Sequence, residues 1–243
     1  MGYCLLLLIA PAVSAIEYTS TEQLPLMIEL YTSEGCSSCP PAENYLNKLK
    51  LHPELWKSIF PLAFHVDYWN HLGWKDRFSK AIYSQRQRDY ARYYQHRNVY
   101  TPAFFVNGKS WRSNWFNNEL PIINKKSSGL LKVRIENNQI NASYQPETNN
   151  SEKFILHLAI AGMGLKSNIQ SGENTGRQAE HEFVVLEYLQ NTRHTGNWKY
   201  NIPESLYKDA NKIAVVTWIS TTKDPAPIQI TGGPYQTRST FTH

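Results

Sequence analysis

Two cysteines separated by two residues stand where an apolar run gives way to a predicted helix. The run LPLMIEL, residues 24–30, predicts a strand, and Cys36 and Cys39 follow it in a turn. Pro40-Pro41 comes directly afterwards and fits the first turn of a helix, where backbone N–H groups have no intrahelical partner. A strand, a turn and a helix start are therefore predicted within one short segment, with both thiols between them.

This placement suits thiol–disulfide chemistry. A helix N-terminus stabilises a thiolate through its unpaired N–H groups and the helix dipole. Cys36 comes first and is expected to be the accessible nucleophile, while Cys39 is expected to resolve a mixed disulfide by attacking Cys36. Glu34 is an auxiliary candidate because its charge opposes thiolate formation nearby. A structural disulfide and a metal site remain as alternatives.

The composition is that of a folded protein, with 41% hydrophobic and 19% charged residues, which excludes disordered and collagen-like chains. Residues 1–15, MGYCLLLLIAPAVSA, are expected to be a signal peptide, although no Lys or Arg precedes the apolar run. The alternative is a buried N-terminal strand. After removal of a leader, Cys36 and Cys39 would be the remaining cysteines, and in a periplasmic or secreted protein they oxidise unless a partner reduces them.

The chain changes character near residue 127. Before it, residues 62–69 predict a strand, residues 72–98 predict a helix, and Asn107-Gly108 predicts a hairpin turn within 99–111. A further helix is expected over residues 113–126. After it come short alternating runs, at residues 130–136, 139–144, 153–161, 181–189 and 212–220. Such runs, separated by turn residues, predict an antiparallel sandwich over residues 128–243.

The segment ELYTSEGCSSC resembles the active-site segment of the thioredoxin superfamily, and Thr101-Pro102 resembles its Thr–cis-Pro loop. More closely, the motifs TSEGCSSCPPAE, FHVDYW, LGWKD, YTP and VNG resemble the DUF1223 family of exported thioredoxin-like proteins, whose function is not settled. The resemblance implies an α/β fold: a thioredoxin-like domain over residues 16–127, with a helical insertion at about 70–98, followed by an antiparallel β-sandwich. It also implies a cis bond before Pro102.

The resemblance implies an exported thiol–disulfide oxidoreductase that acts on protein or small disulfides, with Thr101 and Pro102 holding the partner strand and no organic cofactor. Copper-delivery proteins of the same fold suggest a Cu(I) metallochaperone instead, with His65, His71 or His96 as third ligand. A non-catalytic binding module with a structural disulfide is a further alternative. Thioredoxins usually carry Gly-Pro between their cysteines, so Ser37-Ser38 leaves the direction of the redox reaction open.

Positive charge is concentrated between residues 70 and 98. This segment contributes Lys75, Arg77, Lys80, Arg86, Arg88, Arg92 and Arg97. It predicts either a solvated helix face or a docking surface for an acidic partner or an anionic membrane surface, and nucleic acid is not expected for an exported protein.

Two further polar groups are candidates for the site. His65 and Asp67 share one face of a predicted strand and are expected to be structural or to form a proton relay. In the second half, Glu173, Asn174, Arg177 and His181 form a polar group that predicts hydrogen bonds stabilising a loop.

Overall fold

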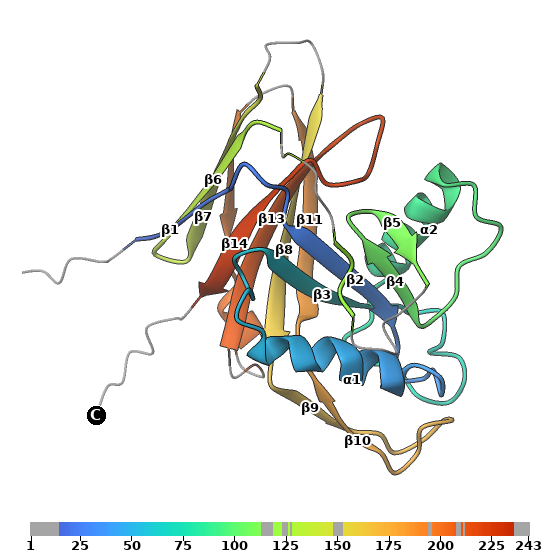
Figure 1. Ribbon diagram of the computed structural model, residues 1–243. Helices are drawn as coiled ribbons and strands as arrows, with labels where there is room; N and C mark the ends of the chain where they lie inside the picture. Colours follow the sequence, from blue (N-terminus) through green and yellow to red (C-terminus); the bar gives the residue numbers. More distant parts are fainter. Residues whose placement is uncertain are drawn as a thin grey trace, which may run out of the picture.

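A long mixed sheet crosses the whole molecule (Figure 1). The computed structural model describes residues 15–112, 119–122, 126, 128–147, 153–193, 196–207, 210 and 212–235. The sheet has eight strands in the order β14-β13-β8-β11-β3-β2-β4-β5. Their bounds are β2 Leu26–Thr32, β3 Ile59–His65, β4 Ala103–Val106, β5 Lys109–Trp111, β8 Phe154–Met163, β11 Val184–Arg193, β13 Lys212–Thr221 and β14 Gln229–Tyr235.

Strands from the two halves of the sequence meet inside this sheet. β2 and β3 run parallel, and β3 also pairs in parallel with β11 through Ala63 and Val184. β11 then continues antiparallel to β8, with a bulge at which Leu186 is the extra residue between Val185 and Glu187. One hydrogen-bonded sheet therefore contains the cysteine-bearing segment and the later strands.

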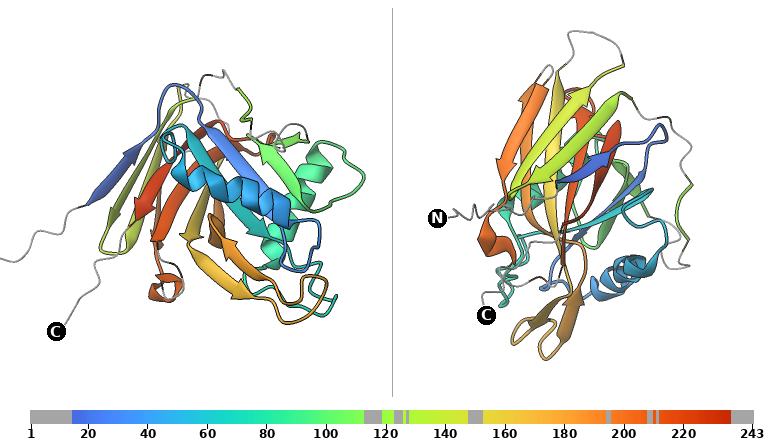
Figure 2. Two further views of the ribbon diagram at one scale, coloured as in Figure 1. Left: turned by 60° about the horizontal axis from the view of Figure 1, so that its bottom comes forward. Right: turned by 90° about the vertical axis from the view of Figure 1, so that its left-hand side faces the viewer.

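A second sheet of four strands covers the β14–β13–β8 end of the first (Figures 1 and 2). Its order is β1-β6-β7-β12, with bounds β1 Ile16–Thr19, β6 Leu130–Glu136, β7 Gln139–Gln145 and β12 Gly196–Asn201. Buried residues alternate with more exposed ones along β6 and β7, as in a sheet with one covered face. Leu131, Val133 and Ile135 pack there against Leu156 and Leu158 of β8.

Two α-helices lie on opposite faces of the long sheet. Leu26, Ile28 and Leu30 of β2 pack with α1, Pro40–Lys48, which a short 3-10 turn at Leu49–Leu51 extends. The intervening Met27 and Tyr31 pack with α2, Ala81–Tyr93. A hairpin of β9, Leu165–Asn168, and β10, Gln178–His181, projects beside α1 at the cysteine end (Figure 1). A second 3-10 turn spans Glu204–Tyr207.

The predicted fold class, a thioredoxin-like α/β domain with a helical insertion followed by a sandwich, is wrong. The structure is mostly β, with 46% strand and 14% helix. The predicted helix over 72–98 is confirmed only in part, because α2 spans Ala81–Tyr93 and residues 72–80 are not helical. Gly73 has a φ of 92°, and the Asp76 carboxylate accepts backbone N–H groups of Glu34 and Phe78, so this stretch forms a loop.

Most individual strand predictions are confirmed. The five alternating runs after residue 127 coincide with β6, β7, β8, β11 and β13 within a few residues. The Asn107-Gly108 turn joins β4 to β5, with φ angles of 45° and 79°. Most of the expected signal peptide, most of the helix expected over 113–126 and residue 127 itself lie outside the described residues. No helix among the described residues is long and apolar enough to cross a membrane.

Candidate functional site: the cysteine turn

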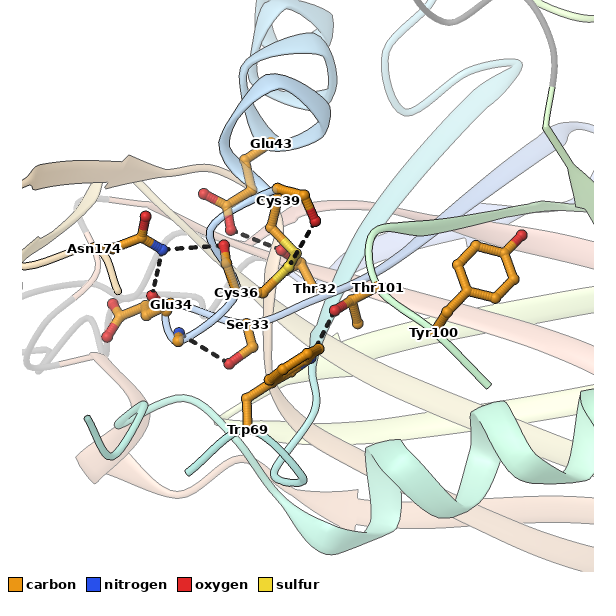
Figure 3. Close-up of a disulfide and its surroundings, with 12 residues drawn as sticks. Thr32, Ser33, Glu34, Cys36, Cys39, Glu43, Trp69, Tyr100, Thr101 and Asn174 are labelled. Atoms are coloured by element: carbon orange, nitrogen blue, oxygen red, sulfur yellow. Dashed lines mark hydrogen bonds between the residues drawn. A yellow bond between two sulfur atoms is a disulfide. The ribbon is translucent and has the colours of Figure 1, made fainter. Parts of the chain in front are cut away.

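The two cysteines form a disulfide at the start of α1 (Figure 3). β2 ends at Thr32 and α1 begins at Pro40, so the turn between them carries Cys36 and Cys39 as predicted. Their Cα atoms are 5.4 Å apart. Cys39 is the N-cap residue, and its carbonyl accepts the N–H groups of Ala42 and Glu43. The strand–turn–helix context predicted from the sequence is confirmed.

Cys36 is buried, which corrects the expectation that it is accessible. It is 2% exposed and Cys39 is 0% exposed, although Ser37 and Ser38 between them are exposed. The loop between β9 and β10 covers the turn, because the Asn174 side-chain amide donates to the Cys36 carbonyl at 3.0 Å and to the Glu34 carbonyl at 2.8 Å (Figure 3). These two hydrogen bonds hold the β9–β10 loop against the cysteine turn.

The Thr101-Pro102 loop lies next to the turn. The peptide bond is cis, which confirms the expectation from the resemblance. Thr101 Oγ1 accepts a hydrogen bond from Trp69 Nε1 at 2.7 Å, and Trp69 packs against Gly35, where an added Cβ would meet the Trp69 Cβ at 3.3 Å (Figure 3). Trp69 therefore joins the cis-proline loop to the cysteine turn.

A buried carboxylate–histidine cluster lies behind the turn, made of Glu34, Glu43, His65, Asp76 and His181. Glu34 Oε1 is 3.1 Å from His181 Nε2, and Glu34 Oε2 accepts a hydrogen bond from Trp74 Nε1 at 2.7 Å. Burial alone would raise the pKa of Glu34, but hydrogen bonds with His181 and other neighbours outweigh it and lower that pKa. The Glu34 carboxylate is therefore kept ionised within this cluster.

Glu43 connects the cluster to α1. Its Oε1 accepts the Thr32 hydroxyl at 2.7 Å (Figure 3). Its Oε2 lies 3.8 Å from Arg177 Nη2 and 3.9 Å from His181 Nδ1, so the Arg177 charge can attract it without a direct hydrogen bond. Glu43 therefore has Arg177 and the His181 ring on one side and the cysteine helix on the other.

His65 and Asp76 form the deepest pair of the cluster. His65 Nδ1 is 2.6 Å from Asp76 Oδ2. Burial lowers the pKa of His65, but the Asp76 charge and hydrogen bond outweigh it, so the pKa is raised. Burial likewise raises the pKa of Asp76, but His65 and the backbone N–H donors lower it overall. His65 Nε2 is buried and has no partner among the described residues.

The structure does not bring Asp67 to His65. The Asp67 carboxylate instead accepts the Ser84 hydroxyl of α2, and the carboxylate that holds His65 is Asp76. The pairing inferred from strand alternation fails because β3 ends at His65 and the chain turns there.

Three residues of the polar group predicted in the second half reach the cysteine turn. Asn174 binds the turn carbonyls, Arg177 faces Glu43, and His181 contacts Glu34. The sequence predicts hydrogen bonds for this group but does not indicate that they reach the cysteine turn, since 138 residues separate Asn174 from Cys36. The concentration of polar side chains in residues 173–181 is the feature of the sequence that marks this segment as a candidate part of the site.

The described residues offer no site for the metal alternative. No three His, Cys, Asp or Glu side chains among them are arranged to hold a metal ion. His71 and His96 are exposed, whereas His65 is buried with its Nδ1 bonded to Asp76. The third ligand expected for a Cu(I) site is therefore not assembled in this part of the chain.

The basic segment is not one surface. Arg86 is buried, with its Nη2 2.7 Å from Glu29 Oε1. Lys80 binds Glu187 at 3.0 Å. Arg88 and Arg97 are exposed and remain candidates for contact with an acidic partner.

Comparison with solved structures shows the same fold elsewhere. A crystal structure of a protein from Agrobacterium tumefaciens aligns over 92% of this chain and 99% of its own, with a TM-score of 0.61 and 19% identity. HBP35 of Porphyromonas gingivalis aligns over 92% of this chain and 79% of its own, with a TM-score of 0.53 and 13% identity. No curated protein matches the chain.

The family comparison agrees with the resemblance seen in the motifs. The matched region, residues 27–220, contains the cysteine turn, the cis-proline loop and the β9–β10 hairpin. Because the match spans most of the chain, the protein belongs to DUF1223, a family of proteins of unknown function.

Proposed function

We propose that this protein is a thiol–disulfide oxidoreductase whose reacting sulfurs are Cys36 and Cys39. The observation that carries the proposal is the disulfide itself, which lies at a helix start between two buried carboxylates in the sequence, Glu34 in the turn and Glu43 in α1. A helix N-terminus favours the thiolate that exchange requires. The buried carboxylates and histidines are groups of the kind that move protons during such chemistry.

As a structural crosslink, this disulfide would contribute little to the stability of the fold. The gain from a crosslink grows with the length of the loop it closes, and a separation of three residues corresponds to only about 2 kcal/mol in the chain-entropy treatment. The protein also has several buried hydrophobic clusters and does not need a crosslink to hold its core. Stability alone is therefore a weak reason for a disulfide at this position.

The surface beside the cis-proline loop supports this proposal. A hollow of about 360 Å³ is lined by Tyr100, Pro102, Phe104, Trp111 and Arg112. Its aromatic walls suit an apolar side chain of an extended protein segment, and Thr101 and Pro102 are the residues we propose to hold that segment. We further propose that the protein is exported to an oxidising compartment, in which a disulfide persists. We also propose that the positive charges of Arg88 and Arg97 favour acidic partners.

The test is trapping through the Cys39→Ser variant. In the exported fraction, Cys36 of this variant should accumulate covalent adducts that dithiothreitol releases, because no resolving thiol remains. The matched control is Cys36→Ser, which should accumulate few adducts because Cys39 is fully buried. Absence of adducts in Cys39→Ser, while iodoacetamide still modifies Cys36, would remove the support for exchange.

The burial of both cysteines favours a second candidate function, a binding module with a structural disulfide. In that case the reduced protein would react slowly with iodoacetamide at Cys36, and reduction would cost about 2 kcal/mol of stability. In an oxidoreductase the reduced protein should instead react quickly with iodoacetamide at Cys36, because exchange requires that thiol to be ionised and reachable.

A further inference from the structure

We propose that Glu43 is the proton acceptor and donor for Cys39 during thiol–disulfide exchange, an inference that rests on the proposed function. Each exchange leaves a proton to be removed from the resolving thiol or returned to it. The arrangement of Thr32, Glu43, Arg177 and His181 provides a group for this task next to a sulfur that water does not reach.

Helix geometry directs Glu43 toward Cys39. The two residues are four positions apart at the start of α1, so their side chains lie on the same face. Side chains of a helix also lean toward its N-terminus, which carries the Glu43 carboxylate back over the cysteine turn. Figure 3 shows the Glu43 side chain extending from α1 towards the turn that carries Cys39, with its hydrogen bond to the Thr32 hydroxyl.

Cys39 needs such a partner because of its burial. Its side chain is fully hidden from solvent, and a buried thiol is harder to ionise than an exposed one. Cys39 must become a thiolate to attack the mixed disulfide on Cys36. A nearby carboxylate removes the proton without requiring water to enter the site.

The surroundings of Glu43 fit this role. The Thr32 hydroxyl fixes one oxygen at 2.7 Å, which leaves the other oxygen among Arg177 and His181. Arg177 is 3.8 Å away, and 26% of its side chain is exposed, so this side of the carboxylate adjoins solvent. A proton taken from Cys39 can therefore leave the site past Arg177.

The proposed oxidation of the reduced protein by a partner disulfide has two steps. The Cys36 thiolate first forms a bond to one partner sulfur, and the other partner sulfur leaves as a thiolate with the electron pair of the broken bond. Glu43 then takes the Cys39 proton, and the Cys39 thiolate attacks Cys36 Sγ and displaces the second partner thiolate. The protein loses two electrons, the partner gains two, and the Glu43 proton passes to solvent or to the leaving thiolate.

The experiment follows the second step in Glu43→Gln. The reduced protein is mixed with 5,5′-dithiobis(2-nitrobenzoate), which releases one coloured thiolate when Cys36 reacts and a second when Cys39 resolves the adduct. In the unaltered protein the rate of the second phase should reach a plateau near neutral pH, because the Glu43 carboxylate supplies the base. In Glu43→Gln its rate should rise about tenfold per pH unit, since it then follows the fraction of Cys39 thiolate.

Matched variants keep the test decisive. Glu54→Gln, an exposed carboxylate just beyond α1, should leave the plateau unchanged. Thr32→Val keeps the Glu43 carboxylate but removes its hydrogen bond, so it should shift the pH at which the second-phase rate reaches its plateau. This variant provides the test if Glu43→Gln does not fold. A normal plateau in both site variants would overturn the inference and leave the proposed function intact. Absence of the first coloured phase in the unaltered reduced protein would instead overturn the proposed function.

Discussion

Replacing Arg86 with Met should strongly destabilise the protein. The guanidinium lies between α2 and the long sheet, where Nε donates to Glu29 Oε1 at 2.8 Å and Nη1 donates to the Tyr188 hydroxyl at 3.0 Å. Glu29 is 0% exposed, and its other oxygen accepts the Tyr90 hydroxyl at 2.7 Å. Methionine preserves the apolar stem but leaves a buried carboxylate without its cation, so we expect a loss of about 3–5 kcal/mol.

A second substitution tests the reason for that loss. Arg86→Met combined with Glu29→Met removes both charges, and a buried ion pair can often be exchanged for apolar residues at little cost. We expect most of the stability to return, with about 1–3 kcal/mol still missing because the Tyr90 hydroxyl loses its partners.

Urea unfolding followed by tryptophan fluorescence measures both variants, since Trp218 lies 4.9 Å from the Arg86 guanidinium. The control is Arg88→Met, an exposed position on the same helix, which should change stability by less than about 0.5 kcal/mol. If Arg86→Met unfolded like this control, or if the double variant were less stable than the single one, the assignment of Arg86 to the core would be refuted.

Three further results are expected. The His65–Asp76 pair should stabilise the fold most between about pH 4 and 6.5, because the raised pKa of His65 makes its contribution disappear at higher pH and the lowered pKa of Asp76 makes its contribution disappear at lower pH. In urea unfolding, the difference in stability between the unaltered protein and His65→Asn should therefore be largest inside this window and shrink below and above it, and the same difference at every pH would contradict the prediction. Asn174→Ala removes two hydrogen bonds to the cysteine turn, so dithiothreitol should reduce the disulfide faster. Thiol labelling over time measures this rate, and an unchanged rate would show that the β9–β10 loop does not limit access. Gly232→Ala places a Cβ 2.1 Å from the Val215 carbonyl oxygen inside the β13–β14 pair, so thermal unfolding should show a loss of about 3 kcal/mol, and a neutral result would be incompatible with this register.

Local signals in the sequence were sufficient for the cysteine turn and for most strands. Pro40-Pro41 after the cysteines specified the helix start, and Asn107-Gly108 specified the β4–β5 turn, because each depends on the backbone preferences of adjacent residues. The alternation of apolar residues in 130–136 likewise depends only on one covered face. Features of this kind can be predicted without knowing what packs against them.

The sheet order and the buried cluster depend on contacts between distant segments. Nothing in the apolar pattern of β3 or β11 specifies that their edges pair in parallel. The sequence therefore predicts a boundary near residue 127, whereas strands from both sides of it belong to one sheet. Asp76 also sits in a stretch with helical spacing, but its carboxylate binds the backbone of Glu34 and the ring of His65. The competing hydrogen bonds exist only after β3 and the cysteine turn have come together.

The bulge in β11 makes the cysteine turn sensitive to the length of a strand far away. Leu186 is the extra residue of the bulge, so the register between β11 and β8 changes there by one residue. Val184, two residues before it, pairs with Ala63 of β3. Deleting Leu186 would force the strand either to exchange its two faces or to pull on β10, which ends at His181, three residues before β11 begins. A single-codon deletion there would therefore displace the histidine that contacts Glu34 and disturb the cysteine turn without touching either sulfur.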